Sequence, residues 1–407
     1  MSTTTSRPTC CALLIVATSM GMLGLCLATD VVRVPIKDKG AGPLFQIHHG
    51  RKWGYMNRQG ATVIAPQFDD EGDFFGGLAR IEVGGKWGFV DQAGRIVIPC
   101  QFEATGNFRE GLAPVLLNRR WGFIDSSGKF VIKPQFEAAA DFSDGLALFE
   151  SWETTRCGNT GSVYTRDNAP PYAFQLDNRQ VSVSGDCFSE NARFGFVDHR
   201  GDAAIAPVFS SAQDFRDGRA LIRVGRPSGS HVGYIDKSGK VVIEPQFDDA
   251  YAFSEGLAAV EVGFRAEGGR KVAGTWGFID HDGKTVIPPK FRWVGSFSEG
   301  LAAVSLPNAR SGYIDKAGKF VIPPRFDDAQ DFSDGVARVS GDDAEDDYFI
   351  DRTGKAALIP QLPVMWSFSD GLTVAGKPGE QKYIDHNGMV VAPYEVDPQA
   401  QLQVTIK

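Results

Sequence analysis

The chain has 407 residues, of which 43% are hydrophobic and 23% are charged, so its composition is that of a folded protein with a core. Its net charge is −8 and it contains no sustained basic run, which argues against a nucleic acid as its partner. With 47 glycines, 29 phenylalanines and 22 prolines, the chain is expected to form many turns between short aromatic-rich strands.

The first 28 residues have the pattern of a secretory signal peptide. Residues 10–28 carry no charge, Arg7 precedes them, and the small residues Cys26 and Ala28 fit a cleavage site. Two alternatives remain open: an uncleaved anchor, because the run is long enough to span a bilayer, and a lipid anchor on Cys26, against which the bulky Leu25 counts. We therefore expect a secreted or periplasmic protein with no membrane span after cleavage.

Residues 29–150 contain the first three copies of an internal repeat. The last glycine of a D-x-x-G element (N-x-x-G in the first copy) recurs at Gly60, Gly94 and Gly128, always 34 residues apart. A fixed period of this kind is the signature of a repeat architecture. Asp at the first position accepts backbone N–H bonds and glycine at the fourth tolerates a positive φ, which predicts a hairpin with a glycine bulge.

Each copy is expected to contain three short strands. In the second copy, "GLARIEV" ends near Val83, "WGFV" starts at Trp87, and "RIVI" follows the D-x-x-G turn. Trp87 and Phe89 fall on one face and Val90 on the other, which is the alternation of a strand. A P-x-F element then ends the pairing, and F-S-[DE]-G redirects the chain into the next copy.

Residues 151–191 interrupt the repeat after its third copy, where the spacing of the glycines grows to 73. This insertion contains Cys157 and Cys187, which we predict to form a disulfide because exported proteins meet oxidising conditions. The remaining cysteine of the mature chain, Cys100, stands where other copies carry proline and is expected to be buried and inert. The sequence leaves open whether the insertion binds a partner or is a disulfide-pinned loop without a function.

Residues 192–395 contain six further copies, and residues 396–407 form a C-terminal tail. The last copies are degenerate, because Asp347 and Gln381 stand where earlier copies carry tryptophan. Terminal capping repeats are often degenerate in this way. The glycines of their D-x-x-G elements are Gly201, Gly239, Gly283, Gly318, Gly354 and Gly388.

The repeat predicts an all-β array of three-stranded hairpin units. One such unit cannot bury its own apolar face, so neighbouring copies must cover it. We expect a β-solenoid-like array, and a propeller-like closed array is the alternative. The closed form is less favoured because propeller blades usually have four strands and ~40–45 residues.

The repeated pattern "WGFIDxxGKxVIxPxFxxAxxFSxGLAxV" resembles the WG-repeat family, also called KWG repeats. The resemblance extends from about Leu44 to Pro393, outside the insertion, so residues 29–150 would be WG repeats 1–3 and residues 192–395 WG repeats 4–9. It implies a β-repeat protein of bacteria, extracytoplasmic or part of a multidomain chain. No common catalytic residue or ligand comes with the motif.

The sequence predicts no catalytic residue, no cofactor, no cofactor-binding residue and no metal ligand. It contains no G-x-S-x-G, H-E-x-x-H, P-loop or G-x-G-x-x-G motif. Apart from the adjacent His48 and His49, whose side chains would face opposite sides of a strand, its histidines include no metal-spaced pair on one element. His199, His281 and His386 are expected to project from hairpin tips. Turn capping accounts for the repeated Asp. We therefore do not expect an enzyme.

Two functions remain after these exclusions. The first is an exported, non-catalytic scaffold that binds a protein or a polymer of the cell envelope. The second is a carbohydrate or cell-wall recognition module in which the repeated Trp and Phe rings are platforms. Regular recurrence of the rings in every copy favours a role in the core, because large aromatics carry much of the burial in a β-core. Exposed Trp rings would favour the second function.

Overall fold

The computed structural model describes residues 42–395 except 152–153, 158–161, 166–186, 189–192, 225–230, 268–269, 273, 308–309, 342–346, 359–362, 364–365 and 378. The described residues belong to the second of two compact units, Pro35–Lys407. The first unit, Met1–Val34, contains the predicted signal peptide and Cys26 and lies outside them, as does the predicted tail of residues 396–407. Among the described residues there is no helix with the length and apolarity that a membrane crossing requires.

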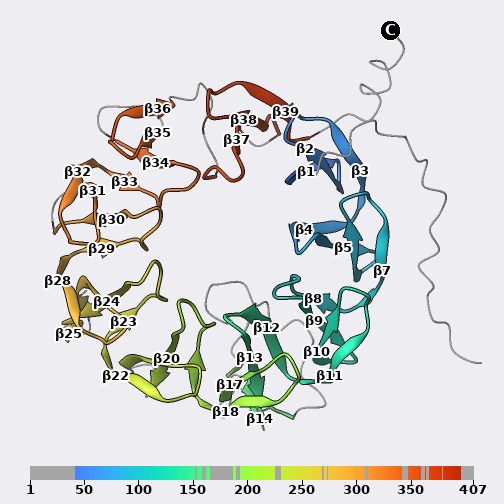
Figure 1. Cartoon of the computed structure of the whole chain (residues 1–407), viewed down its shortest axis with the longest axis horizontal. Coiled ribbons are helices and arrows are strands. Elements are labelled where there is room, and N and C mark those ends of the chain that lie inside the picture. The colour runs from blue at the N-terminus through green and yellow to red at the C-terminus, as the bar shows by residue number, and fades with distance from the viewer. Residues whose placement is uncertain are drawn as a thin grey trace, which may run out of the picture. The chain divides into compact units, whose positions relative to one another are not determined.

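Nine small antiparallel sheets follow one another around a closed ring (Figure 1). We call these sheets blades 1–9 in chain order. Blades 1–3 are β1 (Leu44–His49), β2 (Lys52–Asn57), β3 (Thr62–Phe68); β4 (Asp70–Phe75), β5 (Leu78–Val83), β6 (Lys86–Asp91), β7 (Ile96–Phe102); and β8 (Ala104–Thr105), β9 (Leu112–Leu117), β10 (Arg120–Asp125), β11 (Phe130–Phe136). Blades 4–6 are β12 (Ala138–Ser143), β13 (Leu146–Ser151), β17 (Arg193–Val197), β18 (Ala203–Phe209); β19 (Ser211–Ala212), β20 (Ala220–Val224), β21 (His231–Ile235), β22 (Val241–Phe247); and β23 (Asp249–Ala250), β24 (Ala258–Val262), β27 (Thr275–Ile279), β28 (Thr285–Phe291). Blades 7–9 are β29 (Trp293–Val294), β30 (Ala302–Ser305), β31 (Ser311–Ile314), β32 (Phe320–Phe326); β33 (Asp328–Ala329), β34 (Val336–Ser340), β35 (Tyr348–Asp351), β36 (Ala356–Leu358); and β37 (Leu372–Ala375), β38 (Lys382–Asp385), β39 (Val390–Pro393).

Blades 2–8 have four strands each, and the first strand lies nearest the middle of the ring (Figure 1). The second, third and fourth strands are the three that the sequence predicts. The first strand is an addition: the segment between P-x-F and F-S-[DE]-G does not merely redirect the chain but pairs with the second strand. In blade 3 this pairing joins Ala104 to Leu116 and Thr105 to Val115. A strand of two residues is too short to show the alternation by which strands are recognised in a sequence.

The sequence repeat and the blade are out of phase. A copy that starts at Trp53 contributes β2 and β3 to blade 1 and then β4 and β5 to blade 2. Each of blades 1–8 is therefore joined to the next blade by the chain, and only the junction between blades 9 and 1 is closed without such a connection. The all-β repeat array is confirmed, and its copies close into a ring as in the propeller-like alternative, rather than stacking as an open solenoid.

The glycine of each Trp-Gly pair is required by a close approach of two backbones. In blade 3, Trp121 pairs with Phe136 and Phe123 with Ile132, so the fourth strand bulges opposite Gly122. A Cβ on Gly122 would lie 2.6 Å from both the carbonyl oxygen of Ile132 and the nitrogen of Pro134. Real atoms do not approach this closely, and only glycine leaves the necessary space.

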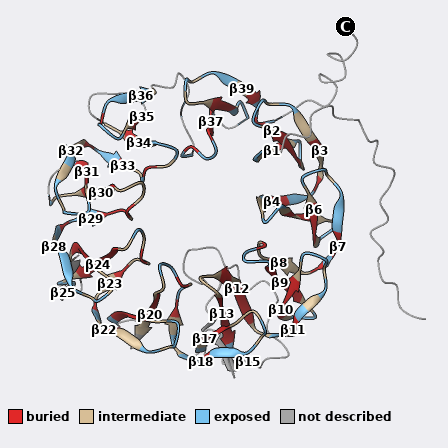
Figure 2. Ribbon diagram, in the orientation of Figure 1, coloured by how far each residue is buried: buried red, intermediate tan, exposed pale blue. Residues whose placement is uncertain are grey.

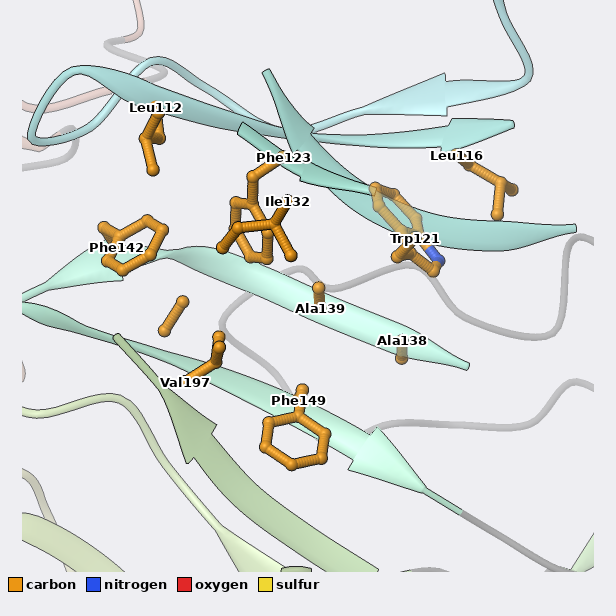
Figure 3. Packing of buried hydrophobic residues seen from close by; sticks show 11 residues of the cluster. Leu112, Leu116, Trp121, Phe123, Ile132, Ala138, Ala139, Phe142, Phe149 and Val197 are labelled. Carbon is orange, nitrogen blue, oxygen red and sulfur yellow. The ribbon is translucent and has the colours of Figure 1, made fainter. Parts of the chain in front are cut away.

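The hydrophobic core lies between neighbouring blades. Figure 2 shows buried residues on the strands inside the ring wall and exposed residues on the fourth strands. Figure 3 shows one such cluster, in which Trp121 and Phe123 of blade 3 face Phe142 and Phe149 of blade 4. The rings of Phe123 and Phe142 are 5.0 Å apart in an edge-to-face arrangement, which is favourable for aromatic pairs. Each blade thus buries its apolar face against the next, as the repeat required.

The F-S-[DE]-G turns bind each blade to its neighbour. Ser298 donates from Oγ to the carbonyl oxygen of Phe332 over 2.7 Å, and Glu299 accepts from the backbone N–H of Gly335 at 3.1 Å. Glu299 adopts a positive φ of 53° to do so. The serine bond recurs between Ser143 and Phe215, Ser254 and Phe297, and Ser333 and Phe368, and the carboxylate bond between Glu110 and Gly145, Asp144 and Gly218, Asp217 and Gly256, Glu255 and Gly300, and Asp334 and Gly371.

Blade 9 closes the ring against blade 1 with a modified set of contacts. His48 donates its backbone N–H to the carbonyl oxygen of Tyr394 over 3.1 Å, and the hydroxyl of Tyr383 donates to that of Gln46 over 2.8 Å. Phe45, on the second strand, packs on Tyr383 at 5.8 Å. At other junctions the equivalent ring comes from the segment that connects the fourth strand of one blade to the second strand of the next, as in the pair Tyr55–Phe74. Among the described residues, blade 1 has no first strand.

Candidate functional site

One face of the ring is variable and the other is regular. The connections between second and third strands lie on the first face. They range from the two-residue turns Gly84–Gly85 and Asn118–Arg119 to a hairpin in blade 6, β25 (Arg265–Glu267) and β26 (Arg270–Val272), and the insertion in blade 4. The opposite face carries the F-S-[DE]-G and D-x-x-G turns in nearly every copy. Variation in length is thus concentrated where a binding surface would not disturb the packing of the blades.

The insertion contributes a small sheet of its own. Its strands are β14 (Thr154–Cys157), β15 (Ser162–Thr165) and β16 (Cys187–Phe188), in the order β15-β14-β16. The register places Cys157 directly opposite Cys187 on adjacent antiparallel strands. Opposite residues have Cα atoms ~4.5–5.5 Å apart, a separation that a disulfide can bridge. The side chains lie outside the described residues, and the disulfide stays a prediction.

A cluster of polar side chains lies on the inner wall beside the closing junction. We call it the seam cluster: Gln46, Tyr55, Glu71, Asp73 and Tyr383. The amide of Gln46 donates from Nε2 to Asp73 Oδ1 over 3.1 Å. The hydroxyl of Tyr55 donates to the carbonyl oxygen of Gly72 over 2.7 Å and lies 3.4 Å from Glu71 Oε2. Two carboxyl groups and two phenols therefore meet at the place where, among the described residues, blade 1 has no first strand.

Glu71 departs from the repeat. It occupies the position at which the first strands of blades 3–8 carry small or apolar residues, and it is only 8% exposed. Burial, together with the charges of Asp73 and Asp70, raises its pKa to about 8. The surroundings of Glu71 therefore favour its neutral, protonated form. The residues at the equivalent positions are Thr105, Ala139, Ala212, Ala250, Val294 and Ala329.

A second set of carboxyl groups lies in or just after the first strands of successive blades, and it includes Asp141 and Asp214. Asp141 in blade 4 accepts from the backbone N–H of Asn107 in blade 3 at 2.9 Å and from its Nδ2 at 3.2 Å. Gly106 makes this possible, because a Cβ there would lie 2.2 Å from Asp141 Oδ1. For Asp214 in blade 5, the preceding blade carries Ala140 at the repeat position that Gly106 occupies in blade 3. The buried Oδ1 of Asp214 has no hydrogen-bond partner. Burial and the charge of Asp141 raise the pKa of Asp214 to about 6.

The repeated tryptophans belong to the core. Trp121 is 6% exposed and Trp276 is 9% exposed, while Trp53 and Trp87 are half-buried. The rings that do reach the surface are outside the Trp-Gly motif: the described part of the chain exposes Trp366 by 47%, and this ring packs edge-on against Tyr394. The repeat therefore does not provide a row of exposed Trp platforms.

The three histidines of the D-x-x-G turns are held against the ring instead of projecting freely. His199, His281 and His386 stack face to face on the phenylalanine of the F-S-[DE]-G element of their own blade. His199 Nε2 lies 3.3 Å from Glu110 Oε2 of the preceding blade. Within the described residues, no three His, Cys, Asp or Glu side chains are grouped as metal ligands. Cys100 is buried, as its proline-like position predicted.

Closed rings of radially arranged small antiparallel sheets define the β-propellers, and the described unit is a nine-bladed one. The model of the WG-containing repeat matches seven segments that together cover more than half of the chain: residues 53–87, 87–120, 121–150, 194–226, 233–263, 276–306 and 312–342. The chain belongs to this family of WG-repeat proteins, which confirms the resemblance seen in the sequence.

Solved structures similar to this chain are remote. The computationally designed Ika8 protein is 11% identical, with 84% of this chain and 99% of that chain covered and a TM-score of 0.40. BamB from Moraxella catarrhalis is 11% identical, with 73% and 93% covered and a TM-score of 0.34. A structure from a study of two prolyl endopeptidases is 13% identical, with 72% and 47% covered and a TM-score of 0.37. At these scores the similarities carry no argument about function. No curated protein matches the chain.

Proposed function

We propose that this protein is an exported, non-catalytic scaffold that binds a protein or polymer of the cell envelope through the variable face of its ring. Export rests on the signal-peptide pattern of residues 1–28, and the expected mature chain begins at Thr29. The intact mass of the secreted protein tests this point: a retained N-terminal segment or a lipid on Cys26 would contradict it.

The distribution of variation around the ring is the observation that carries the proposal. The repeated residues are accounted for by packing and by bonds between blades, as for Trp121, Gly122 and Ser298. The insertion, by contrast, is unique to blade 4. It connects β13 to β17, whereas the corresponding strands of blade 3 are connected by the two-residue turn Asn118–Arg119. A segment that the ring does not need for its own closure is free to serve a partner. A disulfide between Cys157 and Cys187 would hold that segment in one shape.

Replacing Ser151–Asn191 with a short Gly-Ser linker tests the proposal. We expect the circular-dichroism signal of β structure to survive, because blades couple mainly through their neighbours. Envelope components that cross-link to the intact protein should no longer do so. The matched control replaces residues 264–273, the hairpin of blade 6, with Gly-Gly. Retained cross-linking after removal of the insertion would move the site to another part of the ring.

A carbohydrate-recognition function is the second candidate, and the exposure of Trp366 favours it. An exposed ring supported by Tyr394 at 5.7 Å offers a flat apolar face of the kind on which sugar rings stack. Sedimentation with purified cell-wall polysaccharide should then be lost in Trp366→Ala and kept in Trp293→Ala, a second exposed tryptophan on blade 7. Equal sedimentation of both variants would remove this candidate.

A further inference from the structure

Among the described residues blade 1, like blade 9, has no first strand, and β1 therefore has an open sheet edge on the inner wall. In blades 2–8 the second strand is covered on this side by the first strand, as β9 is by β8. In blade 1, β1 is the innermost strand among the described residues (Figure 1). Its inner edge makes a single bridge, a parallel one, between His48 and Glu395. An uncovered sheet edge presents unpaired backbone N–H and C=O groups, which can pair with a further strand.

The hydrogen bonds at this edge differ from those at the equivalent edge of the other blades. In blade 7 the first-strand N–H of Gly295 donates to the carbonyl oxygen of Ala303 on the second strand, over 2.8 Å. The carbonyl equivalent to Ala303 in blade 1 is that of Gln46, and it accepts from the hydroxyl of Tyr383. The corresponding phenols of other blades reach first-strand carbonyls instead, as Tyr313 does with Gln330. In blade 1 the carbonyl oxygen of Gln46 therefore has a donor without an N–H from a first strand.

The chain leads directly to this edge. Every fourth strand from β3 to β32 continues into the first strand of the next blade after one intervening residue. In blades 2, 3 and 6 the carboxylate of this residue accepts a backbone N–H of the connection between the second and third strands. Asp69 does so in blade 2 by accepting from the N–H of Gly84 at 2.8 Å. Glu395, after β39, makes the same contact with the N–H of Gly50 at 3.3 Å. The described chain therefore ends, at Glu395, beside the inner edge of β1.

We propose that residues 396–401 occupy the open edge of β1 and complete the ring as the first strand of blade 1. This inference is independent of the proposed function of the insertion. Counting from Glu395 as the equivalent of Asp69, Pro398 falls where other first strands donate an N–H to the second strand. Proline has no N–H, and Tyr383 supplies the missing donor to Gln46.

Two further positions fit in the same register. Gln399 falls at the equivalent of Asn107, whose N–H and amide both bind the carboxylate of Asp141 in the next blade. The carboxylate that Gln399 would meet is Asp73. Ala400 falls at the equivalent of Phe74, which pairs with the small residue Ala79. In blade 1 the partner of that position is Phe45, whose ring already fills the space, so a small residue is required.

Charge repulsion tests the proposal in the full chain. Gln399→Glu would place a second carboxylate against Asp73, so amides of β1 and β38 should exchange with solvent at least tenfold faster. The matched control Gln403→Glu makes the same change beyond the docked segment and should leave exchange unaltered. Combining Gln399→Glu with Asp73→Lys should restore protection. Equal exchange in Gln399→Glu and Gln403→Glu would overturn the proposal.

Truncation provides a second test. A chain that ends at Glu395 should show the same faster exchange, and the synthetic peptide VDPQAQLQVTIK, residues 396–407, should restore protection when added in trans. The strands β30 and β31 of blade 7 serve as the internal reference. Unchanged exchange after truncation would show that the edge of β1 has no occupant from this segment. If the truncated chain does not fold, the paired glutamate variants still decide the question.

Discussion

Replacing Gly122 with alanine tests the reason for the Trp-Gly motif. The added Cβ would lie 2.6 Å from two backbone atoms of the fourth strand and 2.8 Å from a third, whereas ordinary contacts begin at 3.4 Å. The fourth strand must then move by about 0.8 Å, in a wall packed as densely as a crystal. Overpacking of this kind costs ~3 kcal/mol, of which the stiffer unfolded chain returns ~0.5–1 kcal/mol. We expect a net loss of ~2 kcal/mol.

The control for this experiment separates steric crowding from backbone strain. Gly111 has a positive φ of 86° and no atom within 4 Å of an added Cβ, so Gly111→Ala carries strain alone, ~1 kcal/mol. Urea unfolding followed by circular dichroism gives both stabilities. Fluorescence of Trp121, the neighbour of Gly122, reports the local change. The reasoning would be refuted if Gly122→Ala cost no more than Gly111→Ala.

Three further outcomes are expected. Trp121→Ala should lower the free energy of unfolding by ~3–5 kcal/mol, because it empties a large buried site, and an unchanged urea midpoint would remove Trp121 from the core. Ser298→Ala should cost ~1 kcal/mol by removing the bond to Phe332, measured in the same titration; no loss would mean that this bond does not hold the blades together. Glu71→Gln concerns pH. The raised pKa of Glu71, about 8 against 4.5 for an ordinary glutamate, means that the folded state binds the extra proton between these values, so wild-type stability should fall as pH rises from 4.5 to 8. Relative to wild type, the glutamine variant should become more stable across that window, by at most about 1.4 kcal/mol per pH unit, and parallel pH profiles would contradict this.

The copies, their turns and the strand character of the chain could all be predicted from the sequence. The positive φ of Gly128 and the buried aromatic at Trp121 follow from local chemistry, because a turn or an alternating strand is encoded in a few adjacent residues. The first strand escaped prediction since Ala104–Thr105 is too short to show a pattern. Glu71 was also missed, although its departure from Ala139 and Ala212 at the same repeat position was a signal available in the sequence.

The sequence by itself determined that this chain is a β-repeat whose copies must cover one another. Only the tertiary structure decided that the copies close into a ring. Closure depends on the angle between neighbouring sheets, and no single residue determines that angle. The structure likewise explained the glycine of Trp-Gly, whose crowding by Pro134 arises from a bulge on another strand. It also revealed the seam, where Phe45 and Tyr383 meet although they are separated by almost the whole length of the repeat array. Such contacts belong to no local pattern, since they exist only once the two ends of the array have been brought together.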